Sequence, residues 1–310
     1  MRGIVSVLAL LLAVGLAAPA AADLVAGSGL STEADAVAAG KAAAEQAKKG
    51  LGDKAAKLVL VFQSFPGPDQ AKVLEGIASV FDKAIIHGCS SLAAITDKGN
   101  PRAKAVGLLA LGGDVEVATA VSPKTAGNKH KEAGKALAEA LPKMANARLL
   151  ILFGDCHLPT NKALTEGAQE VVGKELPIIG GAVSGPTGNC FYKGELVPGV
   201  AVGILLGGDF KVVATSRPGA DNEEMVLRTA GEAAKEALSQ FGGRPTLGFL
   251  FECTGRCGKV KDLAAEMPVL QEALGKELPL IGFYGGGEIG PEKGVWTGFG
   301  YHIVCCLIGK

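Results

Sequence analysis

The chain lacks an excess of positive charge, a long apolar run in its body and any linker of biased composition. Lys and Arg together number 31, and so do Asp and Glu. Because a nucleic-acid-binding face needs clustered positive charge, we expect no nucleic-acid partner. Beyond residue 22 no apolar run is long enough to cross a bilayer, which predicts no membrane span in the mature protein. The absence of Pro/Ser-rich or low-complexity stretches favours one continuous body over separate modules.

The motifs of the common cofactor and metal sites are also missing. There is no Cys-x-x-Cys-His haem attachment site, and the spacing from Cys253 to Cys257 has no second matching pair. The glycine clusters do not follow the strand-to-helix pattern that holds a dinucleotide. We therefore expect no cofactor and no metal ion.

Residues 1–22 have the three parts of a secretory signal. Arg2 precedes an apolar stretch over residues 4–16, and three alanines end at Ala22, just before Asp23. This pattern predicts cleavage and an exported protein, either periplasmic or extracellular. The alternative is a segment that is retained as a membrane anchor.

Seven cysteines are an odd number for an exported protein, so at least one thiol is free, ligated or paired between chains. Cys305 and Cys306 are adjacent in a predicted strand and must face opposite sides of its sheet. Export favours disulfide bonds. We expect at least two of four cysteines to lie within bridging distance: Cys156, Cys190, Cys253 and Cys257.

Four landmarks occur three times, in one order and at similar spacing. A helical pattern of small residues surrounds a glycine at Gly40, Gly134 and Gly231. Next, an apolar run ends in phenylalanine, a second apolar run ends at glycine, and a Lys-Gly pair closes each copy. These landmarks are Phe62, Phe153 and Phe251; Gly88, Gly180 and Gly282; and Lys98, Lys193 and Lys293. Recurrence of four landmarks in one order indicates an internal triplication.

The triplication predicts an α/β fold of three βαβ-type repeats, each ordered strand, strand, helix, strand, helix, strand. Strand pairs around Gly-Gly-Asp turns, at 105–119 and 200–215, begin the two later copies. The first copy has a single such strand, Leu24–Gly29, and we expect it to pair with Val295–Ile308 at the other end of the chain. Three sheets joined in this way form a closed pseudo-threefold body without an open edge.

Two groups of motifs resemble those of the FIST family. The C-terminal third has a strand ending in Cys253–Arg256, a helix carrying Glu266, and a Gly-Phe-Tyr turn that leads to Gly-Glu-Ile over Gly282–Ile289. This order is similar to the FIST C-terminal domain. The sequence Gly-Cys-Ser-Ser at Gly88–Ser91 and the glycine turn Gly180–Gly185 resemble the FIST N-terminal domain.

The resemblance covers nearly all of the mature chain and implies a sensory module that binds a small ligand, such as an amino acid or a small carboxylate. It implies an N-terminal-like region over 23–220 and a C-terminal-like region over 221–310. A signal peptide departs from the family's usual place as a cytosolic input domain, and the segment 207–245 is short for the family. No kinase, cyclase or methyl-accepting segment follows, so we expect a separate signalling partner protein.

The motif residues suit recognition of a small charged molecule. Arg256 can present a planar fork to a carboxylate. The glycines at 285–287 let backbone N–H groups approach a ligand, with Glu288 beside them for an ammonium group. We predict a binding site for a zwitterion or small anion formed by seven residues: Cys253, Arg256, Tyr284, Gly286, Glu288, Ser91 and Ser184. Truncation of Arg256 is then expected to weaken binding and leave the fold intact; the alternative is a purely structural ion pair with Glu288.

A second hypothesis is a hydrolase of a cyclic amide or a similar small molecule. Its nucleophile would be Ser91 or Ser184, which needs a neighbouring base of lowered pKa. Lysines recur once per repeat, at Lys98, Lys193 and Lys293, but the serines have no serine counterpart in the third copy. A Lys-Gly pair before a strand is also typical of an exposed turn. We therefore favour a binding protein without catalytic residues over an enzyme.

Overall fold

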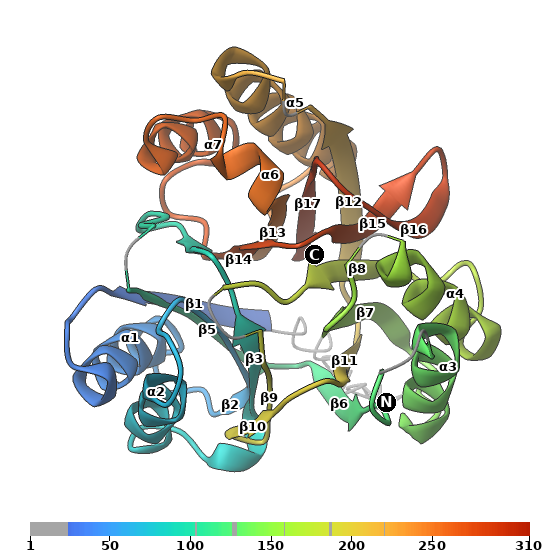
Figure 1. The fold of residues 1–310 in the computed structure, drawn as a ribbon, viewed down its shortest axis with the longest axis horizontal. Coiled ribbons are helices and arrows are strands. Elements are labelled where there is room, and N and C mark those ends of the chain that lie inside the picture. The colour runs from blue at the N-terminus through green and yellow to red at the C-terminus, as the bar shows by residue number, and fades with distance from the viewer. Residues whose placement is uncertain (1–23, 103, 126–128, 158, 186–187, 220) are drawn as a thin grey trace, which may run out of the picture.

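The computed structural model describes residues 24–310 apart from 103, 126–128, 158, 186–187 and 220. Within these residues the chain forms three sheets and seven α-helices in a mixed α/β fold. Figure 1 shows the helices on the periphery, grouped beside the three sheets, with the strands toward the middle. The predicted signal over 1–22 lies outside the described residues, and none of the described helices has the length and hydrophobicity to span a membrane.

One order of elements recurs three times: strand, helix, strand, helix, strand, one or two short strands, strand. The third unit has the short helix α6 in addition. The first unit contains β1 (Leu24–Ser31), α1 (Ala36–Gly50), β2 (Ala56–Gln63), α2 (Asp69–Ala78), β3 (Ile86–Ser90), β4 (Ala94–Thr96) and β5 (Val106–Gly113). The second contains β6 (Glu116–Val121), α3 (His130–Ala140), β7 (Ala147–Gly154), α4 (Thr160–Val172), β8 (Ile178–Ala182), β9 (Cys190–Tyr192), β10 (Glu195–Val197) and β11 (Ala201–Gly207). The third contains β12 (Lys211–Pro218), α5 (Glu223–Phe241), β13 (Leu247–Cys253), α6 (Thr254–Cys257), α7 (Glu266–Leu274), β14 (Leu280–Gly285), β15 (Glu288–Glu292), β16 (Val295–Phe299) and β17 (His302–Gly309).

Helix α5 shows how local chemistry sets these bounds. The side chain of Asn222 caps its start by accepting from Met225 N at 2.9 Å. Glu223 and Glu224 follow in the first turn, where negative charge suits the helix dipole. Gly242 ends the helix with φ 66°, a left-handed conformation that glycine adopts without strain.

Each unit supplies four strands of one sheet in the same order. These orders are β1-β5-β2-β3, β6-β11-β7-β8 and β12-β17-β13-β14. In each sheet, the strands before and after the second helix of the unit pair in parallel, as β2 with β3, β7 with β8, and β13 with β14. A parallel pair joined by a helix is the expected βαβ arrangement.

The predicted element order is present along the chain, for example as β5-β6-α3-β7-α4-β8, with short strands in addition. The predicted pairing of the two ends of the chain is wrong. Strand β1 pairs antiparallel with β5 of its own unit. The segment Val295–Ile308 is divided between β16 and β17, which lie in different sheets. The Gly-Gly-Asp turn after β5 is not a hairpin turn, because β5 and β6 also lie in different sheets. A hairpin turn and a turn between units share the same local residues, so the sequence did not separate them.

Short strands are exchanged between the units. Strand β4 of the first unit pairs with β14 of the third, β9 of the second pairs with β3 of the first, and β15 of the third pairs with β8 of the second. Each unit therefore donates a segment to one neighbour and receives one from the other. The exchange ties the three units together through backbone hydrogen bonds.

The three phenylalanine landmarks meet in one central core. The ring of Phe62 lies 5.9 Å from that of Phe153 and 6.3 Å from that of Phe251, measured between centroids. Phe283 from the third unit lies 4.6 Å from Phe62. Three further apolar clusters fill the space between each sheet and its own helices. Cys306 belongs to the central core and Cys305 to an outer cluster, which confirms that the two thiols face opposite sides of β17.

The glycine landmarks on β3, β8 and β14 are required by close backbone approach. A Cβ atom would lie 1.8 Å from Val61 O at Gly88, 1.9 Å from Leu152 O at Gly180 and 1.7 Å from Leu250 O at Gly282. Because a main-chain carbonyl cannot move aside, no other residue fits. The same constraint in all three sheets explains why these glycines recur in the sequence.

The glycines at equivalent positions of helices α3 and α5 should differ in how well they tolerate replacement by alanine. A Cβ at Gly134 would lie 2.0 Å from Leu164 O of the neighbouring helix, whereas at Gly231 it would meet only Val269 Cγ1, at 2.8 Å. We expect Gly134→Ala to force α3 and α4 apart and to lower the free energy of unfolding by about 2 kcal/mol. Gly231→Ala should be neutral or mildly stabilising, because alanine favours helix by about 1 kcal/mol. Urea unfolding of both variants checks this, and equal losses would contradict it.

Candidate functional site

The carboxyl ends of β3, β8 and β14 meet at one junction. Ser184 N donates to Ser90 O at 3.2 Å, which joins the second unit to the first. Gly286 N donates to Ala182 O at 3.1 Å, which joins the third unit to the second. Leu92 N donates to Tyr284 O at 3.2 Å, which joins the first unit to the third. The three predicted glycine turns therefore lie together, although they are far apart in the sequence.

Ser91 and Ser184 do not occupy equivalent positions at this junction. Ser91 N donates to Gln63 O at 2.8 Å, and the residue making the matching bond in the second unit is Val183, whose N donates to Gly154 O. Ser184 is therefore one residue further along. Its Oγ donates to Tyr284 O at 2.6 Å and accepts from Leu92 N at 3.0 Å. The Ser184 hydroxyl holds two turns together and is already occupied by backbone groups.

The recurring lysines lie in turns, away from these hydroxyls. Lys193 and Lys293 have φ 52° and 49°, and each occupies the tight turn of a short hairpin, β9–β10 or β15–β16. The Lys98 ammonium donates to Ser28 Oγ at 2.6 Å and pairs with Asp97 at 3.0 Å. Among the described residues, none of the three lysines is bonded to Ser91 or Ser184, the serines that the hydrolase hypothesis named; Lys98 is bonded to Ser28 instead.

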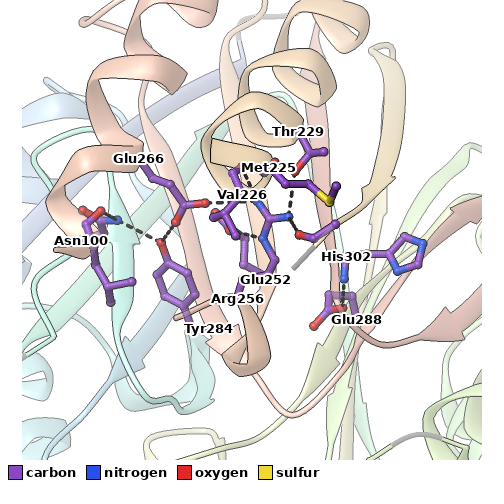
Figure 2. A network of polar contacts seen from close by, with 12 residues as sticks. Asn100, Met225, Val226, Thr229, Glu252, Arg256, Glu266, Tyr284, Glu288 and His302 are labelled. Carbon is purple, nitrogen blue, oxygen red and sulfur yellow. Dashed lines mark hydrogen bonds and ion pairs between the residues drawn. The ribbon is translucent and has the colours of Figure 1, made fainter. Parts of the chain in front are cut away.

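Arg256 lies at the centre of a buried polar network in the third unit (Figure 2). It follows β13 in the short helix α6, and its side chain is 0% exposed. Its Nε donates to Glu252 at 2.9 Å, and Nη2 donates to Glu266 at 3.1 Å. Three more bonds go to neighbours on and beside α5: Nη1 donates to Gly219 O and Thr229 Oγ1, and Nη2 to Val226 O. A guanidinium has five N–H donors, so none is left for a ligand.

The network continues from Glu266 to the first unit. The Tyr284 hydroxyl donates to the Glu266 carboxylate and accepts from Asn100 Nδ2 at 3.0 Å. Asn100 Nδ2 also donates to Leu263 O at 2.8 Å. Burial, followed by the charge of Glu266, raises the pKa of Glu252 well above its usual value, although the adjacent guanidinium of Arg256 acts to lower it.

Glu288 does not pair with Arg256. Its Oε2 accepts from His302 N at 3.0 Å, and among the described residues its buried Oε1 has no hydrogen-bond partner. Burial raises the pKa of Glu288 well above its usual value. Burial and the nearby Glu288 together raise the pKa of the Cys253 thiol to about 11, which leaves that thiol protonated. The alternative interpretation, an Arg256–Glu288 ion pair, is therefore wrong, because Arg256 pairs with Glu252 and Glu266 instead.

The seven predicted site residues lie close to the junction or to the network, but they do not line one open pocket. Cys253, Arg256, Tyr284, Glu288 and Ser91 are buried, and only Ser184 and Gly286 are half-buried. Strand ends that carry polar side chains look the same in sequence whether those side chains face inward or toward solvent. The structure places these residues near one another with most of them buried, and their role in binding a ligand stays a prediction.

An open pocket of about 770 Å³ lies directly over the network and is named here the Arg228 pocket. Its floor includes Gly219 and Thr229, the two residues that accept from Arg256 Nη1. Tyr301, which is 61% exposed and has φ 62°, forms one wall. The full lining is Arg217, Pro218, Gly219, Asp221, Met225, Arg228, Thr229, Glu232, Lys259 and Tyr301.

Comparison with family models decides the identity of the chain. The FIST N domain matches residues 57–244, and the FIST C domain matches residues 202–291. The first match alone covers more than half of the chain. The protein belongs to the FIST family. FIST domains are sensory domains that bind small ligands, and this finding confirms the resemblance drawn from the motifs.

Two solved structures are similar to this FIST protein at low identity. One is a cyanuric acid hydrolase from A. caulinodans, with TM-score 0.45 and 11% identity over 92% of this chain and 99% of that chain. The other is a cyanuric acid hydrolase described as an innovation by structural concatenation, with TM-score 0.43 and 10% identity over 93% and 99%. A search of the curated proteins gave no match. These likenesses do not bear on the function proposed below.

Sequence reasoning missed the residues that line the Arg228 pocket. Arg228 lies on an exposed face of α5, and Lys259 and Tyr301 lie in turns. None of them belongs to a motif, so no local signal sets them apart from other surface residues. A larger pocket of the FIST protein, about 910 Å³, lies at the ends of α3 and α4 and is lined mostly by apolar side chains. None of the seven predicted site residues is among its lining.

Proposed function

We propose that this FIST protein is an exported sensory protein that binds a small amino acid or carboxylate in the Arg228 pocket. The match to the FIST family models supports the sensory role. The assignment of the site rests on the position of the pocket. Two of its lining residues, Gly219 and Thr229, accept hydrogen bonds from the buried Arg256. A ligand that contacts these two residues would act on the interior of the protein through the guanidinium of Arg256.

The charges around the pocket suit a molecule with both an acidic and a basic group. Arg228 and Lys259 supply positive charge, and Asp221 and Glu232 supply negative charge. Arg228 is only loosely paired with Glu232, at 3.9 Å, and both side chains are more than half exposed. Such a surface pair contributes little to stability, so its members are free to turn toward a ligand.

The buried network offers a route by which binding could be sensed elsewhere. A shift of Gly219 or Thr229 would alter two of the five bonds of Arg256. Arg256 is joined through Glu266 and Tyr284 to Asn100, which belongs to the first unit. We propose that this connection transmits occupancy to the surface where a separate signalling partner binds.

A thermal-shift screen of amino acids and small carboxylates tests the proposal. A ligand present at 100 times its Kd should stabilise the protein by about 2.7 kcal/mol. Arg228→Glu and Lys259→Glu should abolish the shift and leave the melting temperature of the free protein unchanged, because both side chains are exposed. Arg244→Glu, an exposed arginine outside this pocket, is the matched control and should keep the shift.

The screen also separates the pocket from the junction of the three strand ends. Ser184→Ala and Cys253→Ala alter that junction and should leave the ligand-induced shift intact. If these variants lose the shift and the two pocket variants keep it, the site lies at the junction and the pocket assignment is wrong. If no amino acid or carboxylate shifts the melting temperature, the proposed ligand class is wrong.

We further propose that residues 1–22 are a signal that is cleaved before Asp23, and that the mature protein lies in the periplasm or outside the cell. N-terminal sequencing of protein recovered from that compartment checks this, and an intact Met1 would contradict it.

The division into regions 23–220 and 221–310 is also a proposal. So is closure of the three units, through their exchanged strands, into a pseudo-threefold body derived from an internal triplication.

A further inference from the structure

Two cysteines face each other where the second unit donates β9 to the first. Cys89 on β3 and Cys190 on β9 are register partners in an antiparallel ladder. Both side chains belong to the central core, so they lie on the same side of the sheet. Their exposed fractions are 0% and 1%. Cys89 was not among the cysteines that the sequence singled out, because its distance from Cys190 along the chain gives no sign of contact.

The hydrogen bonds around this pair fix its geometry. Ser90 N donates to Asn189 O at 2.9 Å, so Ser90 and Asn189 form a hydrogen-bonded pair. In an antiparallel ladder the pairs alternate, which makes Cys89 and Cys190 a non-hydrogen-bonded pair with Cα atoms about 4.5 Å apart. A disulfide spans Cα separations of roughly 4.4 to 6.8 Å. The two thiols can therefore be joined with little movement of the backbone.

We propose that Cys89 and Cys190 form a disulfide that fastens the exchanged strand β9 to β3 when the protein folds in the presence of a disulfide oxidant. All seven cysteines are free thiols in this structure. That two of Cys156, Cys190, Cys253 and Cys257 lie within bridging distance stays a prediction. The inference concerns assembly of the fold and does not depend on the proposed ligand.

The oxidation balances with a small disulfide such as oxidised glutathione. The thiolate of Cys89 attacks one sulfur of the oxidant, forms a mixed disulfide and releases one glutathione thiolate. The thiolate of Cys190 then attacks the Cys89 sulfur and releases the second. The protein loses two electrons and two protons, and the oxidant becomes two thiols.

Burial decides when this reaction is possible. In the closed fold no oxidant reaches the two sulfurs, and burial raises the pKa of Cys89 well above its usual value, as do the nearby Cys190 and Cys156. The hairpin β9–β10 lies at the edge of its sheet and contacts β3 through three residue pairs. Oxidation is therefore expected before this hairpin docks or during its transient release. Cys156, also in this region, is the competing partner for Cys190.

Refolding the wild-type protein with and without oxidised glutathione tests the proposal. Free thiols of the folded, monomeric fraction are alkylated without reduction, and the digested protein is examined by mass spectrometry. With the oxidant we expect alkylation to fall from seven cysteines to five and a cross-linked peptide that joins Cys89 to Cys190. The oxidised protein should melt at a higher temperature, because the bridge closes a long loop of the unfolded chain. Dithiothreitol should remove the increase.

Variants provide the matched controls. Cys89→Ala should leave all six remaining cysteines alkylated and remove the oxidant-dependent rise in melting temperature. Cys305→Ala, another buried thiol, should keep both the cross-link and the rise. Seven alkylated cysteines in the oxidant-refolded wild type, or a cross-link from Cys190 to Cys156, would overturn the proposal without recourse to any variant.

Discussion

Replacing Arg256 by alanine is expected to lower the free energy of unfolding by about 3–5 kcal/mol. The substitution removes the positive partner of Glu252 and Glu266, both of which are buried. It also removes the donor that Gly219 O has in this structure and one of the donors to Val226 O, which keeps its bond from Thr229 Oγ1. Each buried acceptor that loses its partner costs about 1–3 kcal/mol.

The loss should depend on pH in a defined direction. Without Arg256, the folded-state pKa of Glu252, already raised by burial, has no nearby guanidinium to lower it. A raised folded pKa contributes stability below the unfolded value of about 4.3, and that stability is lost as pH rises. The difference between wild type and Arg256→Ala should therefore be smaller near pH 4 than near pH 8.

Urea unfolding at the two pH values measures this difference. Arg228→Ala, an exposed arginine on the neighbouring helix, is the control and should cost less than 1 kcal/mol. Adding Glu252→Gln and Glu266→Gln to Arg256→Ala should recover part of the loss, because no buried charge remains. A stable Arg256→Ala protein that has lost only its ligand would restore the hypothesis drawn from the sequence.

Much of the repeated architecture could be predicted because it rests on local constraints. Gly88 and its two equivalents recur because each faces a carbonyl oxygen within 2 Å of a hypothetical Cβ. Phe62 and its equivalents recur because they meet in one core. Such residues are set by packing within the unit, and a single sequence displays them as a period.

The errors concern choices made between distant segments. The turn at residues 112–114 looks like a hairpin turn, and nothing local shows that its two strands enter different sheets. Arg256 was placed near Glu288 because the strand end at Cys253 and the glycine turn at Gly285 were expected side by side, yet Arg256 pairs with Glu252 and Glu266. In each case several partners satisfy the same local chemistry, and only the packing of the three units selects one.

Each exchanged segment is held by a buried or half-buried amide, as well as by its strand pairing. Asn189 Nδ2, just before β9, donates to Gln70 of α2 at 2.9 Å. Asn100, just after β4, donates to Tyr284 and to Leu263 O in the third unit. Asn161 of α4 donates to the segment β15–β16. A buried amide needs a hydrogen-bond partner at a specific position, whereas an apolar contact does not. These amides therefore favour one docked position of each exchanged segment.

Asn161→Asp is expected to lower the free energy of unfolding by about 3–5 kcal/mol, because it replaces a donor with an acceptor in a site that needs a donor. Asn161 is fully buried, and its Nδ2 donates to Phe299 O at 2.8 Å and to Glu288 O at 3.1 Å. A carboxylate there would face two carbonyl oxygens without a proton to share. Burial would raise the folded-state pKa of the new carboxyl, so its destabilising effect should grow as pH rises from 4 to 8.

Asn222→Asp is the matched control for this change. Asn222 caps α5 by accepting from Met225 N, and a carboxylate accepts that bond equally well at a helix start. Urea unfolding should therefore show no loss for Asn222→Asp and a large, pH-dependent loss for Asn161→Asp. Because both bonds donated by Asn161 Nδ2 go to the main chain of β15 and β16, hydrogen exchange in Asn161→Asp should rise first in that hairpin. Equal stability of the two variants would show that the exchanged hairpin is held by its strand pairing alone.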